Sequence, residues 1–200
     1  MMNLQKLFKA QAELDKHIYE QHPVEDGEDR LAKKILALQV ELGECANEWR
    51  GFKYWSDDRE PRTEIPIDCP YCYGKGYTNH DEVFEGGEPW PCKRCDGSGV
   101  YGYKNPLLEE YVDCLHFILS IGNWLGFRCT KIYEYQCPNI TNQFIKIFYD
   151  TVKLNFAVQD DWGLEGQKFL YEEIFIDFVC LGKTLGFTWE QIEQAYFCKE

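Results

Sequence analysis

Carboxylates stand at helical spacing in two separate stretches of the sequence. Glu41, Glu44 and Glu48 occur at offsets of three and four residues in ELGECANEW. Glu110 and Asp113 occur at an offset of three in EEYVDCLHF. Residues at these offsets share one face of a helix, where like charges repel one another. We therefore expect a positive charge beside them, and an all-oxygen ligand set favours Mg²⁺ or Mn²⁺.

Two such helices can pack antiparallel and direct their carboxylates at one point. Two unit charges about 4 Å apart repel by roughly 4 kcal/mol at an effective dielectric constant near 20, so several pairs would separate the helices unless cations neutralised them. Because Mg²⁺ usually binds substrate phosphates, the expected chemistry is hydrolysis of a nucleotide or another phosphoester. The alternative is a solvated acidic face. Apolar neighbours of the second pair argue against it, namely Leu108, Val112, Leu115 and Phe117.

Four cysteines form two pairs, CPYCYGKG and CKRCDGSG, with Cys69, Cys72, Cys92 and Cys95 as their members. Nineteen residues separate Cys72 from Cys92, a spacing typical of zinc sites built from two CxxC turns. The glycines of each turn permit positive φ angles. Four thiolates leave no open coordination position, so we expect structural rather than catalytic Zn²⁺. The alternatives are a reduced loop, two disulfides, or a site in which His80 replaces one cysteine.

The composition limits the class of protein. The chain has 200 residues, 44% of them apolar, which suits one domain or one domain with a small appendage. Its net charge of −13 disfavours binding to duplex nucleic acid. We see no secretory signal and no run of about 20 apolar residues that would span a membrane. We therefore expect a cytoplasmic protein. In that reducing compartment, clustered cysteines indicate metal binding more than disulfides.

Helical periodicity predicts an all-α domain that an insertion interrupts. We expect helices over 3–21, 29–50, 105–126, 139–156, 167–185 and 188–197. Asn105 with Pro106, and Thr188 with Gln191, are typical of helix starts, and Gly126 and Gly186 are typical of helix ends. From 61 to 103, Gly and Pro accumulate and the periodicity stops. The expected domains are 1–60 with 104–200, and the inserted segment 61–103.

A weak internal repeat links two of the expected helices. LSIGNWLGF and CLGKTLGF both end a helix, so that Gly122 and Gly126 fall on Gly182 and Gly186. The repeat suggests a duplicated helical hairpin, although apolar helices often end in Leu-Gly. The acids upstream do not form a matching set in the second copy, so we expect only one copy to carry the chemistry.

The acidic stretches resemble a family signature. ExxE in one helix followed by ExxD in the next resembles the all-α nucleotide pyrophosphohydrolases, a superfamily that includes MazG and the dimeric dUTPases. QAELDKHI, ELGECANEWRGFKYW and EEYVDCLHFILSIG are similar to the first three motifs of dimeric dUTPases, closest to the form in phages and Gram-positive bacteria. The resemblance covers residues 1–56 and 105–127 and is looser across the C-terminal half.

This resemblance implies a MazG-like helical bundle that forms a homodimer. The implied activity is hydrolysis of dUTP to dUMP and pyrophosphate by metal-activated water. By position in the motifs, Glu41, Glu44, Glu110 and Asp113 would hold Mg²⁺ or Mn²⁺. Glu44 would also orient or deprotonate the attacking water.

The resemblance also implies residues that bind the nucleotide. Gln11 and Asp15 would face the base or sugar, and Lys53 and Trp55 would contact the nucleotide. An aromatic ring that stacks on a base contributes about 1–3 kcal/mol, so Trp55 is a candidate neighbour of uracil. The alternatives are a solvated helix face for Gln11 and Asp15, and core packing for Trp55.

One motif expected from the resemblance is missing. Dimeric dUTPases generally carry a later KNxxNxxRQ motif that binds phosphates, whereas this sequence reads AYFCKE, with only Lys199. Either the sequence is truncated before this motif, or the phosphate contact comes from elsewhere, such as Lys131, Lys146 or Lys153. The difference leaves open a MazG-like hydrolase of another nucleotide.

The cysteine pairs resemble the CxxCxGxG repeats of DnaJ chaperones and would form a zinc knuckle at the tip of a helical hairpin. This insertion could cover the active site, support the dimer or bind a partner protein. Some related phage dUTPases bind repressor proteins, so a catalytically weak binding module is a third interpretation. A phage-encoded protein would act in the cytoplasm of its bacterial host.

Overall fold

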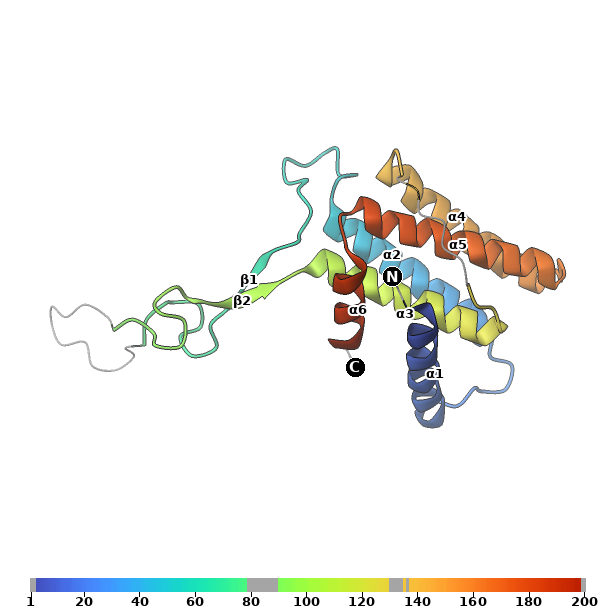
Figure 1. Ribbon diagram of the computed structural model, residues 1–200, viewed down its shortest axis with the longest axis horizontal. Helices are drawn as coiled ribbons and strands as arrows, with labels where there is room; N and C mark the ends of the chain where they lie inside the picture. The colour runs from blue at the N-terminus through green and yellow to red at the C-terminus, as the bar shows by residue number, and fades with distance from the viewer. Residues whose placement is uncertain (1–2, 79–89, 130–134, 136, 199–200) are drawn as a thin grey trace. The chain divides into compact units, whose positions relative to one another are not determined.

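The computed structural model describes residues 3–78, 90–129, 135 and 137–198. Contacts divide the chain into two compact units, Met1–Pro61 with Leu107–Glu200, and Arg62–Pro106. The described residues form the helices α1 (Leu4–Gln21), α2 (Arg30–Trp49), α3 (Pro106–Leu125), α4 (Ile140–Gln159), α5 (Leu164–Thr184) and α6 (Trp189–Cys198), and the strands β1 (Ile65–Asp68) and β2 (Val100–Lys104) (Figure 1). The predicted all-α class is confirmed. His80, Lys131 and Lys199 lie outside the described residues.

Side-chain caps fix the start of four helices. The side chains of Asn3, Asp29 and Asn139 each accept a hydrogen bond from the backbone N–H three residues on, at 3.1, 2.9 and 2.9 Å. Thr188 and Gln191 exchange two such bonds, at 2.9 and 3.3 Å, and form the predicted capping box. These contacts satisfy N–H groups that the first helical turn leaves without intrahelical partners.

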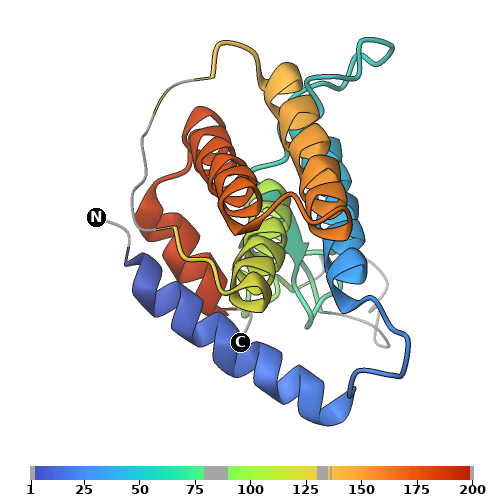
Figure 2. The ribbon, with the colours of Figure 1, turned by 90° about the vertical axis from the view of Figure 1, so that its right-hand side faces the viewer.

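The turn between α4 and α5 is shorter than the sequence predicts. α4 continues to Gln159 rather than 156, and α5 begins at Leu164 rather than 167. Asp161 and Gly163 adopt positive φ angles of 50° and 80°, so the chain reverses direction within a few residues. The two helices consequently run side by side for most of their length (Figure 2).

α3 and α5 pack against each other in a reciprocal arrangement. The hydroxyl of Tyr111 donates to the Phe178 carbonyl, and the hydroxyl of Tyr171 donates to the Ile118 carbonyl, both at 3.1 Å. Each residue of one pair lies sixty positions from its counterpart in the other. Gly122 and Gly182 complete the arrangement, because a Cβ on either would overlap the tyrosine hydroxyl of the opposite helix.

The helix ends of this repeat also match. Gly126 and Gly186 adopt φ angles of 74° and 93°, and the following phenylalanine N–H bonds the carbonyl of Gly122 or Gly182 at 2.9 or 3.0 Å. This is the Schellman ending that glycine favours. The predicted internal repeat is therefore confirmed as a structural repeat of α3 and α5.

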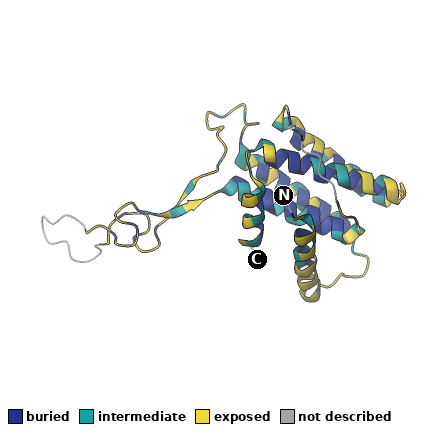
Figure 3. Cartoon of the chain, in the orientation of Figure 1, coloured by how far each residue is buried: buried dark blue, intermediate teal, exposed yellow. Residues whose placement is uncertain are grey.

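α3 is the central helix of its unit, and most of its length is buried (Figure 3). Its side chains bond to each of the helices that flank it. The Asn123 side chain donates a hydrogen bond to the Phe8 carbonyl of α1, and the Ser120 hydroxyl accepts one from Lys34 of α2. The His116 ring stacks on the Tyr196 ring of α6. In the described part of the chain, no helix is long and apolar enough to cross a membrane.

The smaller unit is an antiparallel hairpin with the two cysteine turns beyond it. Ile65 pairs with Lys104 and Ile67 with Gly102, and the register shifts between Ile67 and Asp68. One cysteine pair follows β1, and the other precedes β2. Among the described residues of this unit, few are buried apart from the cysteines, so the cysteine cluster is the core of that described part.

We expect Gly182→Ala to destabilise the protein by about 1–3 kcal/mol, although alanine favours a helix by about 1 kcal/mol. The Tyr111 hydroxyl cannot withdraw from the added Cβ, because its ring stacks on Phe178 at 4.2 Å. Urea denaturation measures the effect. Gly166→Ala in the same helix is the control, since its nearest contact would be an ordinary 3.8 Å. Equal stability of the two variants would contradict the packing argument.

Candidate functional site

Three predicted metal ligands lie together at the junction of α2 and α3. Glu41, Glu110 and Asp113 each offer a carboxylate oxygen, and these oxygens lie within 4.8 Å of one another. All three side chains are half-buried. Glu110 and Asp113 share a face of α3, and that face meets the side of α2 that carries Glu41. The cluster can hold a cation, because hard oxygen ligands at this separation match what divalent cations need.

Glu44 is not part of this three-residue cluster. It lies three residues beyond Glu41 on α2 and is exposed. The assignment of Glu44 as a ligand and as the group that activates water stays a prediction.

The acidic cluster borders a cleft between α1, α2 and α3. Its smaller part, about 490 Å³, includes Glu41 and Asp113 in its lining. Its larger part, about 700 Å³, includes Gln11 and Asp15. The two parts share Leu14, His116 and Phe117 in their linings, so they lie next to each other. These volumes lie in the range of small-molecule sites.

Charge is distributed unevenly along the cleft. Among the described residues that line the smaller part, none is Lys or Arg, and three are acidic. The larger part includes Arg30, Lys33 and Lys34. The smaller end is therefore the more acidic, whereas basic side chains stand among the acids of the larger end.

A hydrogen-bond network lies at the larger end. Gln11 Nε2 donates to Asp15 Oδ1 at 3.0 Å, and the Ser120 hydroxyl lies 2.7 and 2.9 Å from the two Asp15 oxygens. Lys34 Nζ bonds the Ser120 hydroxyl and lies 3.6 Å from Asp15 Oδ1. Gln11 and Asp15 are buried at 3% and 6% exposure, so the alternative of a solvated helix face for them is wrong. Their contact with a base or sugar stays a prediction.

Lys34, Ser120, His116 and Tyr196 complete this network, and sequence reasoning did not assign them to the site. Spacing carried part of the signal. Lys34 lies seven residues before Glu41, and Ser120 lies seven residues after Asp113, so each shares a helix face with an acid of the cluster. No sequence signal pointed to Tyr196, because α6 reaches α3 only through the tertiary fold.

Lys53 and Trp55 are not among the described residues that line the cleft. Lys53 Nζ bonds Asn47 Oδ1, and Trp55 is 65% exposed and packs edge-on against Phe52 and Tyr54. Core packing of Trp55, the alternative to base contact, is therefore wrong. Contact of either residue with the nucleotide stays a prediction.

Lys146, one of the alternatives for phosphate contact, is committed to carboxylates. Its Nζ bonds Asp177 and lies 2.9 Å from Asp150 and 3.7 Å from Glu173. Partial burial acts to lower the pKa of Lys146, but the bonds to Asp177 and Asp150 outweigh it and raise the pKa above its ordinary value. A phosphate contact would have to displace these partners.

Lys153 is another of the alternatives for phosphate contact. Its Nζ lies 5.4 Å from the centroid of the Tyr149 ring.

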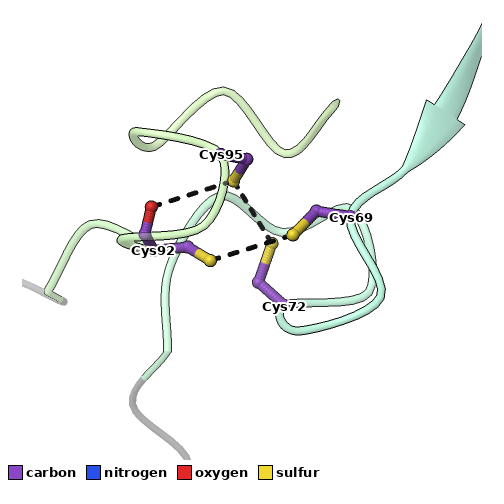
Figure 4. Close-up of side chains that lie close together, drawn as sticks. All are labelled: Cys69, Cys72, Cys92 and Cys95. Carbon is purple, nitrogen blue, oxygen red and sulfur yellow. Dashed lines mark hydrogen bonds between the residues drawn. The ribbon is translucent and has the colours of Figure 1, made fainter. Parts of the chain in front are cut away.

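The four predicted zinc ligands converge in the smaller unit (Figure 4). Cys69 Sγ lies 3.9 Å from Cys92 Sγ, Cys72 Sγ lies 3.8 Å from Cys95 Sγ, and all four sulfurs are within 4.8 Å of one another. All four residues are buried free thiols. This donor set fits a tetrahedral Zn²⁺ site.

The structure explains why the two cysteine turns contain glycine. The N–H of Gly76 points at Cys72 Sγ and that of Gly99 at Cys95 Sγ, both at 3.2 Å. A Cβ on Gly76 would overlap the Gly97 carbonyl, so the two turns pack backbone to backbone. Burial raises the pKa of Cys95, but the Gly99 N–H and the neighbouring thiols outweigh burial and lower it below the ordinary value. The Gly99 N–H thus favours the thiolate of Cys95, the form that binds zinc, whereas burial raises the pKa of Cys72 to about 11 despite the Gly76 N–H.

Comparison with known proteins gives one match. A family model described as dUTPase matches residues 3–68 and 102–200, which leaves the cysteine turns between the two matched parts. A search of curated proteins and a search of solved structures each found no match.

Proposed function

We propose that the chain, which belongs to the dUTPase family, hydrolyses dUTP to dUMP and pyrophosphate with Mg²⁺ or Mn²⁺. Family membership supports a nucleotide pyrophosphohydrolase in general. The observation that carries the proposal is the convergence of Glu41, Glu110 and Asp113 at one end of a cleft whose other end holds Gln11 and Asp15. The cleft suits a nucleotide with its phosphates at the acidic end and its base at the other.

The donor set fits the metal that the family implies. In this proposal Glu41, Glu110 and Asp113 hold the cation, with Glu44 as a further ligand. A bound Mg²⁺ would supply charge neutralisation for the phosphates and a lowered pKa of bound water. In this proposal Glu44 accepts the proton of the attacking water, since it is exposed and lies about one helical turn from Glu41 on α2. Lys53 and Trp55 are proposed to contact the nucleotide from the segment that follows α2.

We expect Glu44→Gln to abolish turnover while the protein stays folded, because an amide keeps the shape but cannot take a proton. The loss should be at least about 10²-fold, and pyrophosphate release from dUTP with Mg²⁺ measures it. Glu165→Gln is the control, since Glu165 is exposed in the first turn of α5 and is not among the described residues that line the cleft. A Glu44→Gln variant with near wild-type kcat would contradict the assignment.

The same assay separates the alternative functions. Release from dUTP alone supports the dUTPase, and release from other nucleotides supports a MazG-like hydrolase. No release with either metal from any deoxynucleotide would favour a binding module, with a repressor or another protein as its partner.

We also propose that the four cysteines of the smaller unit bind one structural Zn²⁺. The support is their burial, their mutual distances and the backbone N–H groups directed at two of the sulfurs. Since so few other residues of this unit are buried, the metal would supply most of its folding energy. Free thiols throughout the described residues suit a reducing cytoplasm.

We expect the native protein to contain about one zinc per chain and Cys69→Ser to lose it. Metal analysis by mass spectrometry measures the content, and limited proteolysis should then cut within 62–106 while the helical unit persists. Cys198→Ser, at an exposed cysteine, is the control and should keep its zinc. Native protein without zinc would end this proposal.

A homodimer is proposed through α2 and α4. Ile145, Tyr149, Val152 and Phe156 form an exposed apolar stripe along α4 at offsets of four and three residues. Leu36 and Val40 are exposed on α2 in the same way. The two helices are neighbours, and Gln39 of α2 bonds Thr151 of α4 at 3.2 Å (Figure 2). Large apolar faces on a surface mark interaction sites, and pairing with the same face of a second copy would bury both.

We expect the wild-type protein to be a dimer and the double variant Ile145→Glu with Phe156→Glu to be a monomer, because a charge buried at an interface costs several kcal/mol. Size-exclusion chromatography with light scattering measures the mass. Leu164→Glu is the control, since Leu164 is 72% exposed in the first turn of α5 and outside the stripe. A monomeric wild type, or a double variant that stays dimeric, would overturn this interface.

A further inference from the structure

The amide of Gln11 is held at both ends. Its Oε1 accepts a hydrogen bond from the Tyr196 hydroxyl at 2.9 Å and lies 2.8 Å from His116 Nδ1. Its Nε2 donates to Asp15 Oδ1 at 3.0 Å. The partners come from α1, α3 and α6, and the Tyr196 ring also stacks on His116 at 4.1 Å. The amide group therefore cannot rotate by about 180°, which would exchange Oε1 and Nε2, without breaking bonds to all three helices.

The Asp15 carboxylate identifies the orientation of the Gln11 amide. Its carboxylate accepts from the Ser120 hydroxyl and lies 3.6 Å from the ammonium of Lys34. A carboxylate only accepts hydrogen bonds, so the group of Gln11 that faces it must be the N–H. The amide oxygen then faces Tyr196 and His116, and His116 Nδ1 carries a proton.

This orientation limits what Gln11 offers a ligand. Both lone pairs of Oε1 are directed at donors, and one of the two Nε2 hydrogens is bonded to Asp15. Gln11 lines the larger part of the cleft, and its three bonds within the described residues leave the second Nε2 hydrogen for a ligand. Gln11 thus presents a donor and no acceptor.

A donor that faces position 4 of the ring distinguishes uracil from cytosine, whereas a donor that faces O2 does not, because both bases carry that carbonyl. Uracil carries a carbonyl at C4, where cytosine carries an amino group. The Gln11 N–H can donate a hydrogen bond to the C4 carbonyl of uracil. Opposite the C4 amino group of cytosine, it would face another N–H donor, and neither group would have an acceptor. A site built to bond one substrate group rejects an analogue that lacks it, because its buried polar group then loses its partner.

We infer that Tyr196 is a positioning residue that holds the Gln11 amide in the orientation that selects a 4-keto pyrimidine over a 4-amino pyrimidine. This inference rests on the proposed function and names the feature of the base that the same site reads. The Tyr196 hydroxyl reaches from α6 to α1, where it bonds Gln11 Oε1 at 2.9 Å.

The test compares Tyr196→Phe with the wild type on dUTP and dCTP, by pyrophosphate release at subsaturating nucleotide. We expect the dUTP to dCTP ratio of kcat/KM to fall about tenfold, the worth of about one hydrogen bond, mainly through a higher KM for dUTP. Tyr171→Phe is the matched control, since it also removes one buried hydroxyl bonded at 3.1 Å, away from the cleft. Its ratio should match the wild type.

The outcomes separate this inference from the proposed function. A Tyr196→Phe variant that keeps the wild-type ratio, or a wild type that hydrolyses dUTP and dCTP equally well, would overturn the inference and leave the hydrolase intact. If wild-type protein releases no pyrophosphate, the proposed function fails, and thermal stabilisation by dUMP against dCMP decides the inference. Should Tyr196→Phe not fold, Gln11→Met tests the donor directly, and an unchanged ratio would overturn the inference.

Discussion

The packing of two tyrosine hydroxyls on two glycines fixes the central helix of this protein. Tyr111 and Tyr171 reach across the contact between α3 and α5 to the backbone beside Gly182 and Gly122, and neither position has room for a Cβ. Protein interiors are dense enough that such a contact tolerates little displacement. Because α3 carries two of the three acids of the cluster, and Ser120 of the polar network, this contact helps to position both ends of the cleft.

The repeat that this packing reveals is structural rather than functional. Sixty residues on from Asp113 stands Glu173, but the counterpart of Glu110 is Leu170, a buried apolar residue. Glu173 instead lies near Lys146, together with Asp150 and Asp177. The second hairpin thus compensates its acids with a lysine of its own. In the first, Glu41, Glu110 and Asp113 lie together as a set that could hold a cation, and the expectation that only one copy carries the chemistry stays a prediction.

The two units have different sources of stability. In the helical unit, a single core of aliphatic and aromatic side chains joins the helices. In the smaller unit, the buried cluster consists of four cysteines, and glycine contacts hold the two turns against each other. An apolar core contributes free energy in proportion to its buried area, whereas a thiol cluster of this size contributes little without metal. The proposed zinc therefore has a thermodynamic reason that the helical unit does not share.

The sequence by itself determined the elements and most of the chemistry-bearing residues, because these depend on local rules. Caps at Asn3, Asp29 and Asn139, the CxxCxGxG turns and the i, i+3 acids are all encoded within a few neighbouring residues. Only the tertiary structure decided which of these residues meet. It brought Glu41 to Glu110 and Asp113 but left Glu44 exposed, and it joined Gln11 to Tyr196, nearly the length of the chain away. The physical reason is that helix periodicity fixes the face on which a side chain lies, while the packing of large side chains, here tyrosines on glycines, fixes which faces come together.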